Sequence, residues 1–184
     1  MKFWINIPLH TKQHVIVEGY ANAMMERRAD LDQIDRKILN QLQKDCRITN
    51  AELAQIAGTS APSCLRRVRR LRMEGYIDRE IALVNPQKAG TCLTSISEVR
   101  LNNHDRRARD EAIRLIKEIP EVIVCYNVTG ERDLMFIAVL SDMSDFEEKI
   151  TERLNSTPVI KSINSYFVIK NIKFQPFIHF DESQ

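Results

Sequence analysis

Residues 49–75, TNAELAQIAGTSAPSCLRRVRRLRMEG, contain two short helical patterns separated by a turn. Thr49 and Glu52 have the spacing of a capping box, in which each side chain accepts a hydrogen bond from the other residue's backbone at the start of a helix. Gly58 suits the left-handed conformation that follows many helices, and Ser60 can cap the next helix, which has a proline in its first turn. This stretch therefore predicts a helix, a tight turn and a second helix.

The second helix combines an apolar stripe with a strongly basic surface. Leu65, Val68 and Leu71 recur at three-residue spacing and are predicted to be buried. Most of the remaining positions are arginines, namely Arg66, Arg67, Arg69, Arg70 and Arg72. Such a cluster repels itself unless a polyanion neutralises it, and the planar guanidinium matches both phosphate oxygens and the O6/N7 edge of guanine.

We interpret this helix as the recognition helix of a helix-turn-helix. The residues expected to contact DNA are Ser60, Ser63, Arg66, Arg67, Arg69 and Arg70. A solvated basic surface is the alternative, but the capped helix and the glycine turn before it favour DNA. Arginine side chains alone do not separate phosphate contacts from base contacts.

Composition and charge are consistent with a DNA-binding part attached to a second folded part. The chain has 184 residues, 43% of them hydrophobic, and a net charge of +2. That length allows one ordinary domain or two small ones. The positive charge is unevenly distributed, because residues 26–84 are net basic and residues 85–184 are net acidic. The basic surplus thus lies with the helix-turn-helix.

The cysteines and histidines are scattered along the chain, at Cys46, Cys64, Cys92, Cys125, His10, His14, His104 and His179. None has the spacing of metal ligands, so we predict no metal site and no cofactor. We expect the cysteines to be small buried hydrophobic residues in a reducing compartment. With neither a membrane-spanning run nor a signal-peptide pattern, the sequence predicts a cytoplasmic, nucleoid-associated protein.

Residues 1–30 are predicted to be an N-terminal extension, for which two interpretations remain. The extension packs on the rest of the protein, or translation starts at Met24 or Met25 and the upstream residues are not native. We favour the second interpretation. The intact mass of the native protein tests it, because a mass that includes Met1 to Ala23 excludes a later start.

Residues 31–84 are predicted to form a winged helix-turn-helix domain. A first helix has apolar residues on one face, namely Leu31, Ile34, Ile38, Leu39 and Leu42. Asp32 can cap it, and Asp35 lies in its first turn, where negative charge is favoured. Residues 76–77 and 81–84 are interpreted as strands that could form the wing. Pro86 then ends regular structure, and residues 85–90 are predicted to be a linker.

Residues 91–174 alternate strand-like and helical patterns. Strands are expected at residues 92–101, 122–128, 133–140 and 159–169, and helices at residues 106–119 and from Asp142 onward. This order is that of a ferredoxin-like βαββαβ domain, which makes the chain an α+β protein. Residues 175–184 are predicted to be a C-terminal tail. The sheet face away from the helices needs a cover, and a second copy of the chain would supply it, so we expect at least a dimer.

In this combination, the segments resemble the Lrp/AsnC family of bacterial and archaeal regulators. The resemblance is carried by LDQIDRKILNQLQKDCR (31–47), ELAQIAGTS (52–60), CLRRVRRLRMEGYI (64–77), PEV (120–122), CYNVTGERD (125–133) and VIKSINSYFVIK (159–170). It implies a winged helix-turn-helix joined to a ferredoxin-like effector-binding domain. It also implies dimers that assemble into octamers or related rings, and DNA affinity that responds to an amino acid or similar metabolite.

The same resemblance implies an effector site beside the loop that joins the second and third strands. Its residues here are Thr129, Gly130, Glu131, Arg132 and Asp133, with Ser165 on the closing strand. Gly130 permits close backbone approach, and Asp133 could accept a hydrogen bond from a ligand ammonium group. Alternatively, Gly130 only makes the turn, and Asp133 caps it or pairs with Arg132.

Three functions are compatible with these features. The first is a sequence-specific transcriptional regulator tuned by an amino acid, and the second is a low-specificity nucleoid-organising protein. The third is an enzyme, because some tetrapyrrole-processing decarboxylases are similar to this family in architecture. The only histidine inside the effector-binding fold is His104, and no cluster of acid, base and nucleophile is apparent, so we expect no enzymatic activity.

Overall fold

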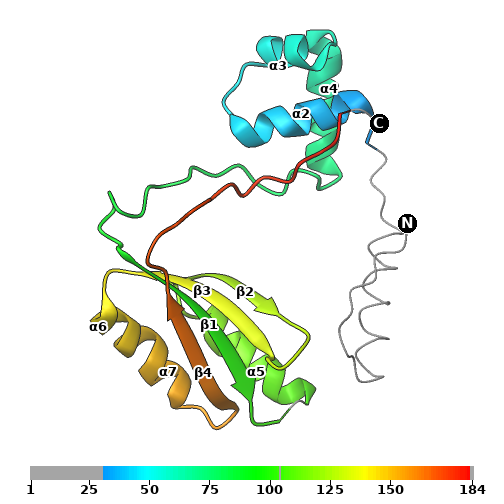
Figure 1. Ribbon diagram of the computed structural model, residues 1–184. Helices are drawn as coiled ribbons and strands as arrows, with labels where there is room; N and C mark the ends of the chain where they lie inside the picture. The colour runs from blue at the N-terminus through cyan, green and yellow to red at the C-terminus, as the bar shows by residue number, and fades with distance from the viewer. Residues whose placement is uncertain (1–30, 104, 183–184) are drawn as a thin grey trace. The chain divides into compact units, whose positions relative to one another are not determined.

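The computed structural model describes residues 31–103 and 105–182 (Figure 1). The predicted N-terminal extension, with the alternative start at Met24 or Met25, and His104 lie outside the described residues. Contacts divide the chain into two compact units. The first unit runs to Ala82 and also contains the segment from Phe174 onward, whereas the second unit is Leu83–Lys173. Each unit has a hydrophobic core of its own.

The first unit contains three helices, α2 (Gln33–Lys44), α3 (Asn50–Ala57) and α4 (Ala61–Met73). Asp32 and Asp35 form a capping box at the start of α2, which confirms the predicted cap. The helices share one apolar core, made of Leu31, Ile38, Leu39, Leu53, Ala54, Ala57, Cys64, Val68 and Leu71. The apolar face predicted for the first helix is therefore confirmed, and it packs into a core that all three helices share.

The segment after α4 differs from the prediction of two wing strands, because residues 76–92 contain no strand. The backbone N–H groups of Tyr76 and Ile77 both donate to the carbonyl of Leu71, so these residues close the end of α4 around Gly75, whose φ is 78°. Residues 81–84 are exposed. A strand requires a pairing partner for its backbone, and residues 81–84 find none within the described ranges.

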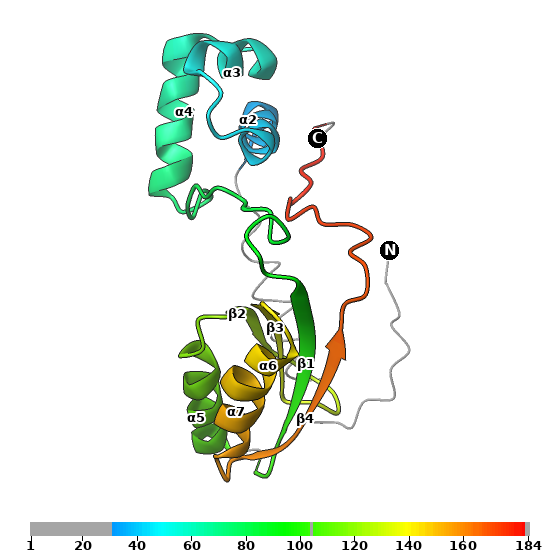
Figure 2. The same ribbon diagram turned by 90° about the vertical axis from the view of Figure 1, so that its left-hand side faces the viewer.

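The second unit is a four-stranded antiparallel sheet with helices on one face (Figure 2). Its strands are β1 (Leu93–Leu101), β2 (Val122–Asn127), β3 (Leu134–Leu140) and β4 (Ile160–Phe167), in the spatial order β2-β3-β1-β4. Its helices are α5 (Arg106–Lys117) and a continuous segment formed by α6 (Met143–Phe146), the π-helical turn η1 (Glu147–Glu152) and α7 (Arg153–Asn155). The predicted βαββαβ order is confirmed.

The two faces of this sheet differ in burial. Residues that point toward the helices form the core, including Val99, Leu101, Phe136 and Ala138. The alternate residues on β3 are Met135, Ile137 and Val139, which are only half-buried. The sheet therefore presents a second face, with apolar side chains along β3, that no helix of this unit covers.

Candidate functional site

The predicted helix-turn-helix is formed by α3 and α4. Thr49 and Glu52 make the predicted capping box, and Gly58 ends α3 in the left-handed conformation with φ 74°. The Ser60 side chain accepts a hydrogen bond from Ser63 N at the start of α4. Local sequence chemistry thus determines the turn, since each cap satisfies backbone groups that the helix itself leaves unpaired.

The buried stripe of α4 is rotated from the predicted one. Cys64, Val68 and Leu71 are buried, whereas Leu65 is 40% exposed. On α3, Ile56 is 51% exposed, and the buried apolar residues are Leu53, Ala54 and Ala57. The prediction used a spacing of three residues, but a helix of 3.6 residues per turn places positions i, i+4 and i+7 on one face.

Two of the arginines predicted to contact DNA, Arg67 and Arg70, form ion pairs at the start of helix α2 in the same unit. Arg67 Nη1 lies 2.6 Å from Asp32 Oδ2 and 2.9 Å from Asp35 Oδ1, and Arg70 Nη2 pairs with the other oxygen of Asp35. Asp35 is 1% exposed, and its two carboxylate oxygens are paired with these two guanidinium groups. Burial alone would raise the pKa of Asp32, but hydrogen bonds from the Asp35 backbone and Arg67 hold it below its usual value.

The remaining arginines of α4 face solvent. Arg72 pairs with Glu80, whereas Arg66 and Arg69 are exposed and have no hydrogen bond or ion pair within residues 31–103 and 105–182. Ser60 is exposed and Ser63 half-buried at the start of the helix. Of the six residues predicted to contact DNA, Ser60, Ser63, Arg66 and Arg69 thus make no ion pair within the described ranges, while Arg67 and Arg70 join α4 to α2.

The predicted effector loop joins β2 to β3. Thr129, Gly130 and Glu131 are exposed, and Gly130 has a φ of 125°, which a side chain would strain. Arg132 Nε lies 2.9 Å from Glu98 Oε2, so its partner is a β1 carboxylate and not Asp133. The loop thus offers free surface at its tip and a fixed ion pair at its base.

Asp133 is buried at the end of this loop and hydrogen-bonded to the backbone of β1. The residue is 8% exposed, and its Oδ2 accepts a hydrogen bond from Leu101 N at 2.9 Å. Its backbone N–H donates to Val99 O, and its carbonyl accepts from Val128 N. The Asp133 carboxylate, for which the sequence left open a ligand contact or a structural role in the turn, therefore makes a structural hydrogen bond at the end of β1.

Ser165 lies away from the tip of the loop. Its hydroxyl is 2.9 Å from that of Ser97, its partner in the β1–β4 register. Ser97 is fully buried on the helix side of the sheet, and Glu98, the partner of Arg132, points to the opposite side. Within one described chain, Ser165 and Arg132 are thus on opposite faces and do not form one pocket.

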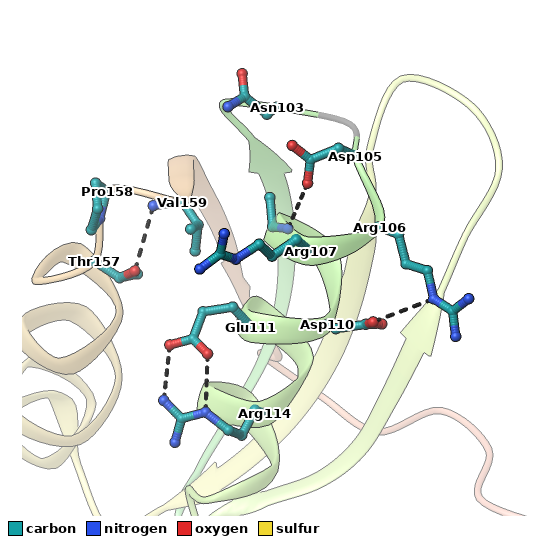
Figure 3. Close-up of a pocket in the computed structure, with 11 residues that line it drawn as sticks. Asn103, Asp105, Arg106, Arg107, Asp110, Glu111, Arg114, Thr157, Pro158 and Val159 are labelled. Atoms are coloured by element: carbon teal, nitrogen blue, oxygen red, sulfur yellow. Dashed lines mark hydrogen bonds and ion pairs between the residues drawn. The ribbon is translucent and has the colours of Figure 1, made fainter.

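A hollow of about 880 Å³ lies elsewhere in the second unit, between the start of α5 and the residues before β4 (Figure 3). Its charged residues pair along the helix, with Arg106 Nε 3.5 Å from Asp110 and Arg114 Nη2 2.8 Å from Glu111. Because cations and carboxylates alternate along it, this surface favours no single ligand charge. No motif in the sequence marks this hollow.

The remaining sequence predictions concern cysteines, metals and membranes. Cys64 is buried and Cys125 half-buried, and burial raises the pKa of both thiols, but Cys46 and Cys92 are exposed, which contradicts the expectation that all four are core residues. Residues 31–103 and 105–182 contain no cluster of three side chains able to hold a metal ion. None of the described helices is long and apolar enough to cross a membrane.

Comparison with known proteins matches both units. Residues 31–78 match the family model for a winged helix-turn-helix DNA-binding domain, and residues 94–177 match the model for the Lrp/AsnC ligand binding domain. The leucine-responsive regulatory proteins of Escherichia coli K12 and Salmonella typhimurium are 35% identical over 144 residues, which is 78% of this chain and 88% of theirs.

Solved structures agree with these matches. A Neisseria meningitidis transcriptional regulator in complex with L-Met is 32% identical, with a TM-score of 0.76 over 80% of this chain and 96% of that chain. An AsnC family transcriptional regulator from Agrobacterium tumefaciens is 29% identical, with the same TM-score and the same coverage. Both units are thus matched in the order in which they occur here, and the chain belongs to the Lrp/AsnC family of transcriptional regulators.

Proposed function

We propose that this regulator binds double-stranded DNA through α4, and that an amino acid or related small metabolite modulates its DNA binding or assembly. The observation that carries the DNA-binding part is the state of the arginines on α4. Arg66 and Arg69 are exposed without a partner in the described residues, whereas Arg67 and Arg70 both form ion pairs with Asp35. Exposed guanidinium groups on the second helix of a helix-turn-helix can donate hydrogen bonds to phosphate oxygens and to the O6/N7 edge of guanine.

Assembly is the second part of the proposal. The half-buried apolar residues of β3 leave the open face of the sheet without a cover, and a second copy would bury it. A dimer would present two α4 helices, which could read half-sites about 34 Å apart in successive major grooves. Dimers would then assemble into octamers or related rings in the cytoplasm, at the nucleoid.

The effector part rests on the relatives and on the exposed loop tip. The Neisseria regulator was solved with L-Met, and the leucine-responsive proteins are named for an amino acid. In this chain, Thr129, Gly130 and Glu131 offer exposed backbone and side-chain groups that a ligand could contact. We propose an amino acid at this tip, with further contacts supplied by a neighbouring dimer, and no other cofactor.

Two experiments test these proposals separately. In the first, DNA affinity is measured over a range of salt concentrations on an operator fragment and on random DNA. A large affinity ratio supports a sequence-specific regulator, whereas equal affinities favour the nucleoid-organising alternative. In the second, thermal unfolding is followed with each of the twenty amino acids, beginning with L-methionine and L-leucine. A ligand that binds only the folded protein raises its melting temperature, so twenty null results at millimolar concentration would reject the amino-acid effector.

The remaining alternative from the sequence is an enzyme. The leucine-responsive regulatory proteins and the solved relatives of this chain are named as regulators and not as enzymes. We therefore propose that the protein acts through binding and not through chemistry.

A further inference from the structure

The C-terminal segment contacts the first helix of the DNA-binding unit although it follows the last strand of the effector-binding unit. Residues from Phe174 onward belong to the first unit, and Figure 1 shows the red end of the chain reaching α2. The hydrogen bonds between them join residues 135 to 149 positions apart in the sequence. A merely solvated tail would not make such a series of contacts.

The contacts with α2 are of a specific kind. Asn40 Nδ2 donates to Phe180 O at 2.8 Å, and Asn40 Oδ1 accepts from Phe180 N at 3.1 Å. Gln43 repeats the pattern, with Nε2 donating to Ile178 O at 2.9 Å and Oε1 accepting from Ile178 N at 2.7 Å. Each carboxamide thus satisfies both backbone groups of one residue, as a neighbouring strand would in a sheet.

The site on α2 has a regular geometry. Asn40 and Gln43 lie one turn apart on the helix, and they bind Phe180 and Ile178, respectively. Residues 178 and 180 are two positions apart, so their backbone groups point in the same direction in an extended chain. On the same stripe, Arg36 Nη1 donates to Asp181 O at 3.1 Å and Gln33 Nε2 to Glu182 O at 2.8 Å. These four side chains form a ladder for the backbone of residues 178–182.

One side chain of the segment anchors the ladder. Phe180 packs against the apolar core of the DNA-binding unit, whereas Phe177 and Ile178 are exposed. Recognition therefore combines backbone hydrogen bonds, which are tolerant of sequence, with one aromatic contact, which selects the register. This combination is how extended peptides are commonly bound along a protein surface.

We propose that α2 is a docking site for the chain's own C-terminal segment, residues 177–182, and that the docked segment braces the DNA-binding unit. The partner is thus an extended peptide with an aromatic residue at position 180. The brace contacts the same helix whose Asp35 holds Arg67 and Arg70. This proposal goes beyond the proposed function and does not depend on the identity of an effector or an operator.

Hydrogen exchange of the intact protein provides the test. A chain that ends at Pro176 is compared with the full chain, and exchange of the α2 amides is followed by mass spectrometry. Loss of several net hydrogen bonds should accelerate exchange in α2 by about tenfold or more, and an added peptide FIHFDESQ should restore the protection. Unchanged exchange in the shortened chain would overturn the proposal.

Single substitutions separate docking from general damage. Phe180→Ala should accelerate α2 exchange nearly as much as the truncation, whereas Phe174→Ala, at a residue that is 63% exposed, should not. Equal effects of the two substitutions would reject Phe180 as the anchor. Isotope-labelled chains that end at Pro176 are then assembled with unlabelled full chains. The α2 amides of the shortened chains should stay unprotected from exchange. Protection of these amides would mean that the segment docks on α2 of a second copy and not on α2 of its own chain.

Discussion

Arg67 Nη1 lies 2.9 Å from Oδ1 of Asp35, a residue with 1% exposure at the centre of the DNA-binding unit. The arginine belongs to the recognition helix α4 and the aspartate to α2, so the ion pair joins the two helices. Charge density along α4 predicted that Arg67 contacts DNA. The structure gives Arg67 a contact inside the unit, so a loss of DNA binding in a variant of Arg67 would not by itself locate the interface.

Substitution of Arg67 should therefore lower stability. We expect Arg67→Met to reduce the free energy of unfolding by about 1–3 kcal/mol, because the buried Asp35 then retains only Arg70 as an ionic partner. Urea unfolding monitored by circular dichroism measures this change. Arg66→Met is the matched control and should stay within about 0.5 kcal/mol, since Arg66 is exposed. Equal stabilities of the two variants would contradict a structural role for Arg67.

DNA binding should depend on the exposed arginines. We expect Arg66→Ala or Arg69→Ala to weaken operator binding by about tenfold at moderate salt, without a change in melting temperature. If a phosphate contact is lost, the slope of log affinity against log salt should fall by about 0.9. Fluorescence anisotropy measures both, with Lys117→Ala on exposed α5 surface as a charge-matched control. Wild-type affinity in both arginine variants would exclude this face of α4.

Asp133 should act through stability and not through an effector. Removing its carboxylate leaves the buried backbone N–H of Leu101 without that acceptor. We expect Asp133→Ala to destabilise the effector-binding unit by about 1–3 kcal/mol, and Glu131→Ala, whose side chain is 92% exposed, to change stability by less than about 0.5 kcal/mol. Thermal unfolding distinguishes them, and an Asp133→Ala variant as stable as Glu131→Ala would disprove this role.

Acid stability should depend on Lys149. Its ammonium lies 3.0 Å from Glu121 and 3.2 Å from Asp145. Hydrogen bonding to Lys149 lowers the pKa of Glu121 from 4.5, and hydrogen bonds from Ser141 and Lys149 lower that of Asp145 from 3.8. A lowered carboxyl pKa contributes stability above the unfolded-state value, and the contribution is lost as pH falls through the folded-state value.

Lys149→Met should consequently lower the urea midpoint at pH 7 by a small amount, since all three groups are partly exposed and solvent screens their attraction. The difference from wild type should shrink as the pH falls below about 4. Urea unfolding midpoints between pH 3 and pH 7 measure it, with Lys117→Met as the control. A pH-independent difference would show that lost packing, and not charge, accounts for the effect.

The open face of the sheet should mediate dimer formation. Ile137 lies on β3 at the centre of that face and is only half-buried in one chain. We expect Ile137→Lys to shift the protein toward monomers, because a buried, unpaired ammonium opposes association. Analytical ultracentrifugation measures the mass. Met143→Lys on the exposed start of α6 is the control, and an unaltered mass in Ile137→Lys would place the dimer contact elsewhere.

The helix-turn-helix and the order of elements in both units could be predicted from sequence because their signals are local. Capping pairs such as Thr49 with Glu52, a left-handed glycine at position 58 and alternating apolar residues on the strands act over a few residues. The wing strands at residues 76–77 and 81–84 were predicted from the same kind of pattern and are absent. Strand propensity alone does not provide the pairing partner that a strand requires.

The sequence by itself thus determined the family, the two-part architecture and the helix that carries the basic charge. Only the tertiary structure decided which arginines of α4 are available, since the pairing of Arg67 with Asp35 joins residues 32 positions apart. The tertiary structure also decided that the Asp133 carboxylate accepts a hydrogen bond from the backbone of Leu101. It likewise decided that Phe180 bonds to Asn40, which lies 140 positions away in the sequence. In each case, a charged or polar group is used by a partner that is distant along the chain, and local patterns carry no information about such partners.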